Sequence, residues 1–599
     1  MKYIILHISF LITLCCCQET KLEKALQLAE NNRKELEKVL THYSIHPKDS
    51  LKYKAACFLI ENMPGHYTKV GNILDSCRHT PLPIIQQKVL DICCGVYLDT
   101  ITTKLEDTKT ITADYLIRHI DSSFKLLEYP WIKELPFEWF LDYVLPYRLE
   151  YEQLTPWRDS LFLTTNSAIH EIMIEDKKYD ASRITLEGNF SESFSLFDYY
   201  YNFFKKNLNS ECQYLYLREV FINRAKGLPA VLDFFPYYPN RNGSHYWANI
   251  LSPYRKQKRI WGSPVCIAAK VYRRTYSHNF DIYKQSNEYI PPFFRDPFNK
   301  DVTDEYFYTQ DITLNALKHM PKNIRYSYLC VFNSSHWLPI AQGYRKKDTF
   351  FFSKMGKGIV YLPIFFWQNN MFPLDYPFAL HLNGNIQKFI PDTINTIDLC
   401  LYRKYPYSNR VDFSKHFSNI TIEGMKYSNS QNYDTLTTWN MTKPQYYIDS
   451  KIRESITYRY LRISCPQGCY IADLHFWNKN GEKLQPIKTD STKFITDDNP
   501  LTELGSKHKI IILDFGQEVN IARIVCIPRG DGNGIYPENT YELFFYELGG
   551  WKSLGRKKAN DFYIKYSKVP SNALLWLHNL TTGQEERIFT VENGDIRFW

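Results

Sequence analysis

The 599-residue sequence lacks several features that define large classes of proteins. Beyond Leu14 it has no apolar run of about 18 residues, the length that a membrane-spanning helix needs. It has no pair of Cys-x-x-Cys units, so we expect no structural zinc, no other metal and no cofactor. Its net charge of +9 comes from dispersed Lys and Arg and forms no basic stripe. Such a surplus is typical of a solvated surface and argues against a nucleic-acid partner.

The composition is rich in aromatic residues, with 46 Tyr and 38 Phe, while Gly and Pro are moderate at 24 and 30. These values indicate a folded, β-leaning chain without a disordered tract. A chain of this length is expected to hold about three to four domains. We therefore predict a multidomain α+β protein.

Residues 1–17 have the order of a secretory signal, with Lys2, an apolar run and three cysteines before polar residues. This order resembles a bacterial lipoprotein signal, in which the new N-terminal cysteine is lipidated. The resemblance implies lipidation of Cys17, with Cys15 or Cys16 as alternatives. We expect an exported protein with a lipid anchor in the outer membrane or cell surface, and a secreted or periplasmic protein is the alternative.

Residues 18–125 are expected to form a helical region. Apolar residues recur at helical spacing in 22–43, 51–62, 84–96 and 113–127. The pattern continues over 136–158, where Arg148 and Glu152 lie among aromatic residues. These polar groups either line a cleft or form buried ion pairs between helices, and we favour the ion pairs.

A thiol lies where the sequence predicts the start of a helix. Asn209 and Ser210 are good N-cap residues, and the run that follows them predicts a helix that ends at Gly227. Cys212 would then lie in the first turn. The positive end of the helix dipole favours a thiolate, which is the form that attacks a carbonyl.

An imidazole follows in a second element. The sequence predicts an apolar strand over 230–235, a loop, and a strand that begins with His245. With Arg224, Gly227-Leu228-Pro229 and His245-Tyr246-Trp247, this order resembles the transglutaminase-like family of cysteine hydrolases and acyltransferases. The resemblance implies an α+β core, expected over 126–320, with Cys212 as nucleophile and His245 as base. The other interpretation is that both residues belong to a hydrophobic core.

The sequence departs from the family where a residue should orient the histidine. Members usually carry an Asp on the strand after it, but no Asp or Glu occurs between Tyr246 and Phe280. The expected strand offers Ser263. The alternatives are Asn249, Asp233 on the preceding strand, or a backbone carbonyl. A catalytically degenerate core therefore stays open.

Two C-terminal β-sandwich modules are expected. From about residue 325, short runs rich in β-branched and aromatic residues alternate with polar clusters. The runs at 326–332, 337–341, 349–352 and 359–365 predict a first module over 321–440, which includes a polar linker. A second set of runs, starting near Tyr458, predicts a module over 441–599.

The second module has further sequence features of its own. The strand 513–516, the stretch 521–524 and the loop 528–533 resemble discoidin-like, galactose-binding jelly-roll domains. The resemblance implies that Arg529, Asp531 and Asn533 contact a glycan or a cation. The simpler interpretation is that this loop makes a tight turn.

The order of lipid anchor, helical region, Cys/His core and two β modules resembles surface lipoproteins of Gram-negative anaerobic bacteria that carry a transglutaminase-like domain. We therefore expect a cell-surface cysteine hydrolase or acyltransferase that acts on a peptide, protein or glycopeptide amide through a thioester. The alternative is a surface binding protein whose core is inert and whose β modules hold glycan or protein.

Overall fold

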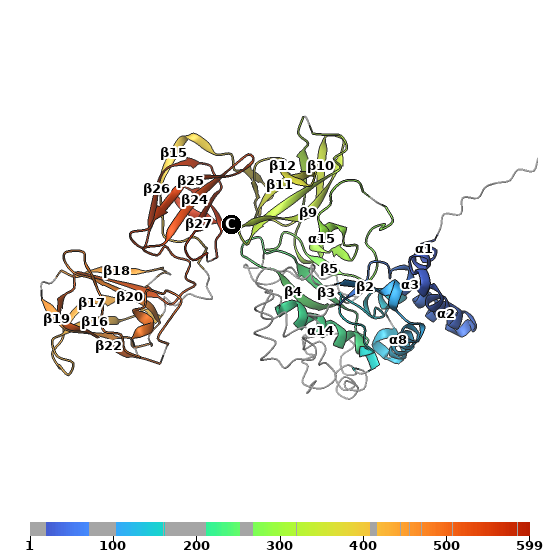
Figure 1. The fold of residues 1–599 in the computed structure, drawn as a ribbon, viewed down its shortest axis with the longest axis horizontal. Helices are drawn as coiled ribbons and strands as arrows, with labels where there is room; N and C mark the ends of the chain where they lie inside the picture. The colour runs from blue at the N-terminus through green and yellow to red at the C-terminus, as the bar shows by residue number, and fades with distance from the viewer. Residues whose placement is uncertain are drawn as a thin grey trace, which may run out of the picture.

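The computed structural model describes residues 20–70, 103–161, 211–251, 267–407 and 416–599, except the isolated positions 134, 160, 285, 319, 442, 444, 454, 455, 469, 491, 506 and 584. Within this part every α-helix precedes residue 310, and strands dominate afterwards. This confirms the prediction of a mixed α and β chain with a β-rich C-terminal part. Figure 1 shows the blue N-terminal helices at one end of the long axis and orange sheets at the other. No described helix combines the length and apolar character that a membrane crossing needs.

The N-terminal helices pack around one apolar core that includes Leu36, Val39, Leu59 and Leu116. Thr20 and Thr112 cap two of them by accepting hydrogen bonds from the backbone N–H groups of the residues three positions later. The helices are α1 (Lys21–Leu28), α2 (Arg33–Ser44), α3 (Ser50–Glu61), α7 (Asp107–Thr110), α8 (Ala113–Lys125), α9 (Pro130–Lys133) and α10 (Phe137–Tyr143), and a small sheet pairs β1 (Tyr67–Val70) with β2 (Thr103–Glu106).

The single helix predicted over 22–43 is wrong, because the chain breaks between α1 and α2. Glu30 has a positive φ of 50°, and a 3-10 turn spans Glu30–Asn32. Asn32 Nδ2 donates to the backbone oxygens of Thr108 and Ile111, at 3.0 and 2.9 Å. These long-range bonds stabilise the break over continuous helix. The predicted helix over 84–96 lies outside the described residues.

A buried ion pair joins two segments of this region, as expected for the 136–158 stretch. Arg148 and Asp107 are both 0% exposed, and the guanidinium donates to both carboxylate oxygens, at 2.7 and 2.8 Å. Arg148 Nη2 also donates to Thr68 Oγ1 at 2.8 Å. The arginine therefore connects β1, α7 and the segment after α10.

The central sheet carries the predicted strands. Helix α14 (Glu211–Ala225) ends before Gly227, whose φ of 77° suits a helix C-terminus. The antiparallel order is β4-β3-β5-β6, and α14 packs on β3 and β4 through Val220, Phe221 and Leu232. The strands are β3 (Ala230–Phe235), β4 (His245–Ile250), β5 (Tyr272–Arg274) and β6 (Asn299–Asp301), followed by α16 (Thr303–Tyr306); α15 (Pro292–Arg295) lies between β5 and β6.

An eight-stranded sheet follows, and both faces of its central strands are buried. Along β8, Leu329 and Val331 face the sheet's own core, whereas Cys330 and Phe332 face a second core that includes Trp576. The order is β14-β13-β11-β8-β9-β10-β7, with β12 beside β11. The strands are β7 (Gln310–Asn315), β8 (Tyr326–Asn333), β9 (His336–Lys346), β10 (Thr349–Met355), β11 (Ile359–Trp367), β12 (Asn370–Pro373), β13 (Phe378–Leu380) and β14 (Ile386–Lys388).

The remaining strands form two units, each made of two sheets around its own core. The inserted unit (416–528) has sheet orders β17-β16-β19-β22 and β18-β23-β20-β21. The C-terminal unit (392–401 with 535–599) pairs β15 with β26 against β25-β24-β27-β28-β29. The strands are β15 (Asp392–Leu401), β16 (Ile420–Met425), β17 (Asp434–Trp439), β18 (Ile448–Lys451), β19 (Thr457–Ser464), β20 (Ile471–Trp477), β21 (Lys483–Leu484), β22 (Ile510–Asn520), β23 (Arg523–Pro528), β24 (Thr540–Glu547), β25 (Gly550–Lys558), β26 (Ile564–Ser571), β27 (Leu575–Asn579), β28 (Ile588–Glu592) and β29 (Asp595–Phe598).

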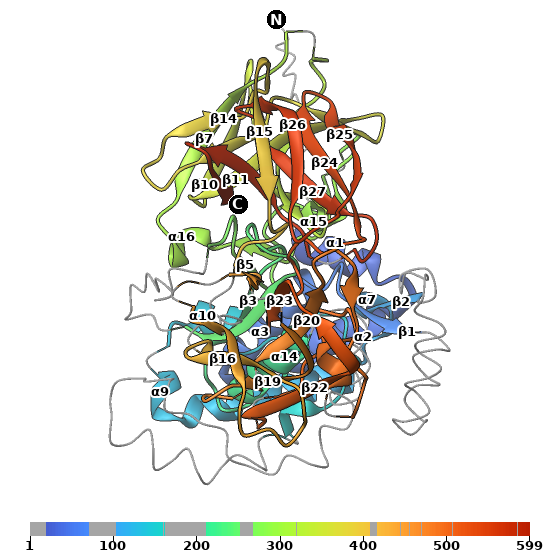
Figure 2. The ribbon, with the colours of Figure 1, turned by 90° about the vertical axis from the view of Figure 1, so that its left-hand side faces the viewer.

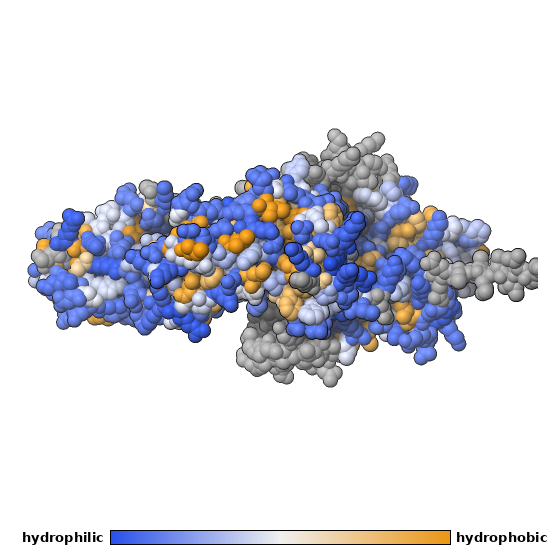
Figure 3. Space-filling view, turned by 90° about the horizontal axis from the view of Figure 1, so that it is seen from above, coloured by the Kyte–Doolittle hydropathy of each residue, from blue (hydrophilic) through white to orange (hydrophobic). Residues whose placement is uncertain are grey.

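This pairing changes the expected module boundaries. The boundary between 440 and 441 falls inside one sheet, because β16 lies before it and pairs with β19 after it. The expected module 441–599 is divided between the two units, and β15 reaches the second of them from before the insertion. Figure 2 shows β15 beside β26 and the inserted unit's β16, β19 and β22 below them. On the face in Figure 3, hydrophobic side chains are scattered among hydrophilic ones.

The buried ion pair gives a stability prediction. Replacing Arg148 with Ala leaves the Asp107 carboxylate buried without its guanidinium, and we expect the N-terminal region to lose about 3–5 kcal/mol of stability. Hydrogen exchange at the amides of α8 measures the loss. Arg118→Ala is the matched control, because Arg118 pairs with Asp159 at the surface and is 61% exposed on its side chain. Equal exchange rates in both variants would contradict the assignment.

Candidate functional site

The thiol-bearing helix lies directly against the histidine-bearing strand. Cys212 is in α14, and its side chain lies outside the described atoms. Position 212 shares a helix face with Tyr216, one turn later. The Tyr216 ring centroid is 6.4 Å from that of His245, with the rings nearly perpendicular at 83°. The backbone therefore places position 212 about one helical turn, roughly 6 Å along the helix axis, from a residue that packs beside His245.

His245 lies in an aromatic environment at the start of β4. Its ring is 5.6 Å from Phe235, 6.2 Å from Tyr238 and 5.7 Å from Trp247, and the residue is half-buried. Burial, and secondarily the positive charge of Arg241, lowers the pKa of His245 below the usual value for histidine. A lowered pKa keeps the imidazole neutral near pH 7, which is the form that accepts a proton.

Asp233 and Asn249 come together, but in a separate polar network. Arg273 donates to both Asp233 oxygens, at 2.8 and 2.9 Å, and Tyr306 also donates to this carboxylate. Asn249 Nδ2 donates to Asp233 at 3.3 Å and to Tyr306 Oη at 2.9 Å. Asp233 is 0% exposed, so Arg273 compensates a fully buried charge.

This network lies farther along the sheet than His245. Asp233 is opposite Trp247, while His245 is opposite Phe235. Asn249 is four residues beyond His245, about 13 Å along an extended strand. Asp233 and Asn249 thus have structural partners of their own, and their role beside His245 stays a prediction. Ser263, the other candidate, lies outside the described residues.

Two residues of the C-terminal half hold the loop 236–244, which leads from β3 to His245. Asn333 Nδ2 lies 3.0 Å from each of the backbone oxygens of Tyr238, Arg241 and Gly243, and Asn333 Oδ1 accepts from the Gly243 N–H at 3.1 Å. Arg587 donates to the backbone oxygen of Pro239. No local pattern in the sequence predicts these contacts, because each joins residues at least 90 positions apart.

The loop predicted to bind a ligand is engaged in internal contacts. Asp531 accepts from Arg403 at 2.7 Å and from the Asn533 N–H at 3.0 Å. Arg529 pairs with Glu503 at 2.8 Å. Asn533 is 1% exposed, and its backbone oxygen accepts from Lys404 N at 3.1 Å. The loop therefore joins the two C-terminal units, as well as forming the turn that the simpler interpretation expects.

A cavity of about 530 Å³ lies elsewhere in the C-terminal unit. It is bounded by β15 and by the turns before β27 and after β28. Its polar lining includes Asp398, Ser571, Asn572 and Asn593, and Leu399 and Leu575 contribute apolar surface. Its volume lies within the range of about 300–1,000 Å³ that is usual for small-molecule sites.

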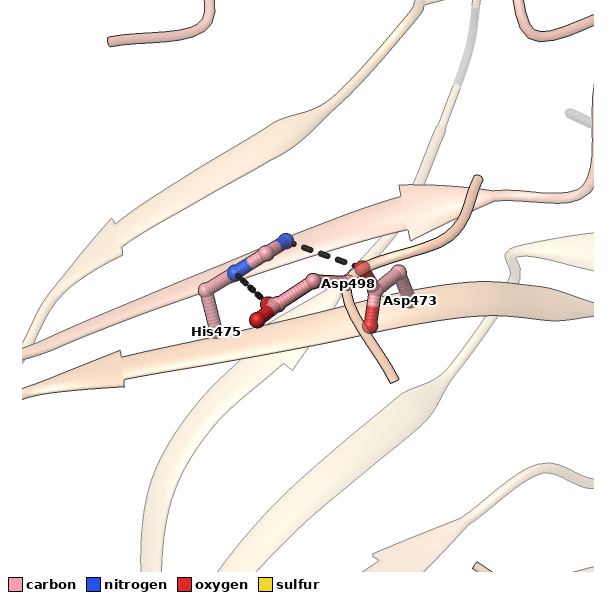
Figure 4. A group of neighbouring side chains, drawn as sticks. All are labelled: Asp473, His475 and Asp498. Atoms are coloured by element: carbon pink, nitrogen blue, oxygen red, sulfur yellow. Dashed lines mark ion pairs between the residues drawn. The ribbon is translucent and has the colours of Figure 1, made fainter. Parts of the chain in front are cut away.

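A cluster of possible metal ligands occurs in the inserted unit. Asp473, His475 and Asp498 each offer a ligand atom, and these atoms lie within 4.8 Å of one another (Figure 4). Sequence reasoning missed the cluster. Its one local signal is the spacing of Asp473 and His475 on β20, whereas Asp498 comes from a loop more than 20 residues away.

No family model, curated protein or solved structure matches this chain.

The position of Arg241 predicts a pH effect. Arg241→Gln removes a positive charge that disfavours the imidazolium, so the pKa of His245 should rise while burial keeps it below the usual value. NMR titration of protein labelled with ¹³C-histidine measures the pKa. Arg325→Gln is the control, because it removes an exposed guanidinium between β7 and β8, and it should leave the pKa of His245 unchanged. An unchanged or lower His245 pKa in Arg241→Gln would be inconsistent with this electrostatic role.

Proposed function

We propose that the protein is a transglutaminase-like cysteine hydrolase or acyltransferase that acts on amide bonds of peptides, proteins or glycopeptides. The observation that carries the proposal is the packing of α14 on β4, with Tyr216, one turn after Cys212, beside His245. The sequence resemblance to the family supports the same pair. A neutral His245 suits the part of a general base.

In the proposed reaction, His245 takes the proton of the Cys212 thiol as the sulfur attacks the carbonyl carbon. The backbone N–H of Cys212 and a neighbouring donor stabilise the oxyanion. The carbon–nitrogen bond then breaks, His245 returns the proton to the departing amine, and a thioester remains. Water attacks the thioester in hydrolysis and an amine attacks it in transfer, in each case giving a proton to His245 and restoring the thiol.

The β-rich half fits a substrate-holding role in this proposal. Asn333 and Arg587 connect the β-rich half to the loop before His245. A substrate bound to the β-rich half at these contacts would therefore lie near His245. The discoidin-like resemblance and the cavity beside Asp398 favour a glycan-bearing substrate.

The reactivity of Cys212 tests the proposal. Alkylation of the intact protein with iodoacetamide from pH 6 to 8, followed residue by residue by mass spectrometry, should label Cys212 rapidly. His245→Gln should slow this labelling by about tenfold or more, because the thiol then lacks the base that takes its proton as the sulfur attacks. Cys330 is an internal reference that should stay unlabelled, because it is fully buried and burial raises its pKa.

His42→Gln, on the exposed side of α2, controls for loss of any histidine. Slow labelling of Cys212 at the same rate in wild type, His245→Gln and His42→Gln would contradict the assignment of Cys212 as nucleophile and His245 as base. The protein would then be better described as a surface binding protein whose cavity near Asp398 holds the ligand.

The N-terminal cysteines define the proposed location. We place the mature protein on the cell surface through a lipid on Cys17, on the strength of the signal-like residues before it. Cys17→Ser should move the exported protein from the membrane fraction to the soluble fraction, as judged by immunoblotting after expression in a Gram-negative host. Cys16→Ser is the control. Retention of both variants in the membrane would argue against a lipid anchor at Cys17.

A further inference from the structure

Three polar atoms come together where the inserted unit meets the start of the C-terminal unit. Asp473 and His475 are two positions apart on β20 and therefore project from the same face. His475 Nε2 lies 3.1 Å from Asp473 Oδ2 and 3.0 Å from Tyr536 Oη. Tyr536 Oη in turn donates to Asp473 Oδ2. These atoms form a compact nitrogen and oxygen set that a single ion can contact.

The buried carboxylate of Asp473 needs a compensating positive charge. Asp473 is 0% exposed, and its second oxygen accepts the Leu474 N–H at 3.0 Å. Among the described residues, the imidazole of His475 is the group at ion-pair distance from Asp473, while Lys483 pairs with Asp498 at 2.6 Å. A buried carboxylate without compensation is costly. Either an imidazolium or a bound cation therefore stabilises it.

Asp498 orients the imidazole. His475 Nδ1 lies 3.4 Å from Asp498 Oδ1, on the side of the ring opposite to Asp473 (Figure 4). Metal-binding histidines commonly direct their second ring nitrogen to a carboxylate, which fixes the tautomer and ring position. With Nδ1–H toward Asp498, the Nε2 lone pair faces Asp473 and Tyr536. The hydroxyl hydrogen of Tyr536 is already directed to Asp473, so Nε2 faces two oxygen atoms.

We propose that this cluster binds one divalent cation of the zinc type through His475 Nε2, Asp473 Oδ2 and Tyr536 Oη, with Asp498 positioning the ring. Zinc ligands at about 2.0–2.2 Å in tetrahedral geometry are about 3.3–3.6 Å apart, so the three atoms move apart when the ion binds, and the Tyr536 and Asp473 oxygens move the most. The proton that Tyr536 shares with Asp473 leaves to solvent when the ion binds, since ligands bind metals in deprotonated form.

The site would join two parts of the chain. Tyr536 lies between β23 of the inserted unit and β24 of the C-terminal unit. The His475 ring is also 5.1 Å from Phe562, which belongs to the C-terminal unit. A cation here therefore fixes the inserted unit to the C-terminal unit and has a structural role that is independent of Cys212.

The test uses the intact protein, stripped with a chelator and titrated with Zn²⁺ in competition with a chromophoric chelator. Wild type should bind one Zn²⁺ that His475→Gln and Asp473→Asn lose, with affinity reduced more than about 100-fold, since both remove a ligand. Asp498→Asn should reduce the affinity about 10- to 100-fold, the usual effect of a residue that orients a ligand. His578→Gln is the matched control, because His578 pairs with Glu586 at 2.8 Å outside the cluster, and it should bind as wild type does.

Circular dichroism of each stripped variant checks folding. Should a ligand variant fail to fold, Co²⁺ bound to wild type decides the matter, because a protein site with nitrogen and oxygen ligands gives visible absorption unlike that of the hydrated ion. Lack of Zn²⁺ binding or of a Co²⁺ spectrum in wild type would overturn the proposal and leave the cluster as a hydrogen-bonded group between the two units. Binding that His475→Gln leaves unchanged would also overturn it.

Discussion

The buried guanidinium of Arg587 is the contact on which the arrangement of the chain's two halves depends. It is 0% exposed and donates to backbone oxygens of Trp599, Phe332 and Pro239, which belong to the C-terminal unit, the eight-stranded sheet and the loop before His245. Burial lowers the pKa of Arg587 to about 10, while the nearby Tyr405 and Glu585 act in the opposite direction. The three segments must therefore stay together, because separation would leave several buried polar groups without partners.

Asn333 reinforces this arrangement from a strained turn. Ser334 and Ser335, which connect β8 to β9, both have positive φ values, 50° and 64°. Two-residue hairpins of this type favour Asn and Gly, so two serines cost free energy. Hydrogen bonds across modules offset that cost, since Ser334 N–H donates to Asn242 Oδ1 at 2.9 Å and Asn333 contacts three carbonyls of the same loop. These hydrogen bonds thus hold the loop that precedes His245, and they keep the turn in its strained conformation.

Local pattern predicted the elements well and their partners poorly. The apolar run 230–235 corresponds to β3 and the position of Gly227 to the end of α14, because hydrophobic periodicity and left-handed backbone are local properties. The break after α1 depends on Asn32 reaching Thr108, which no local pattern encodes. Likewise, the pairing of β15 with β26 spans an inserted unit. The pairing of β16 with β19 crosses residue 440, so the boundary expected there divides a sheet. At the site, the sequence predicts Cys212 and His245, but Arg273, Tyr306 and Asn333 come from distant positions, as does Tyr536 in the cluster around His475.

Two buried aspartates show why the same residue type has different meaning in different surroundings. Asp233 and Asp473 are both 0% exposed on strands. Asp233 receives a bidentate guanidinium, a phenol and an amide, so its charge is compensated and its geometry fixed. Asp473 has a phenol, a backbone N–H and an imidazole whose other nitrogen already faces Asp498. A guanidinium cannot leave such a pair as a neutral group, whereas an imidazole can give up its proton and bind a metal. The first carboxylate therefore has a fully compensated charge, and the second retains the chemistry of a cation site.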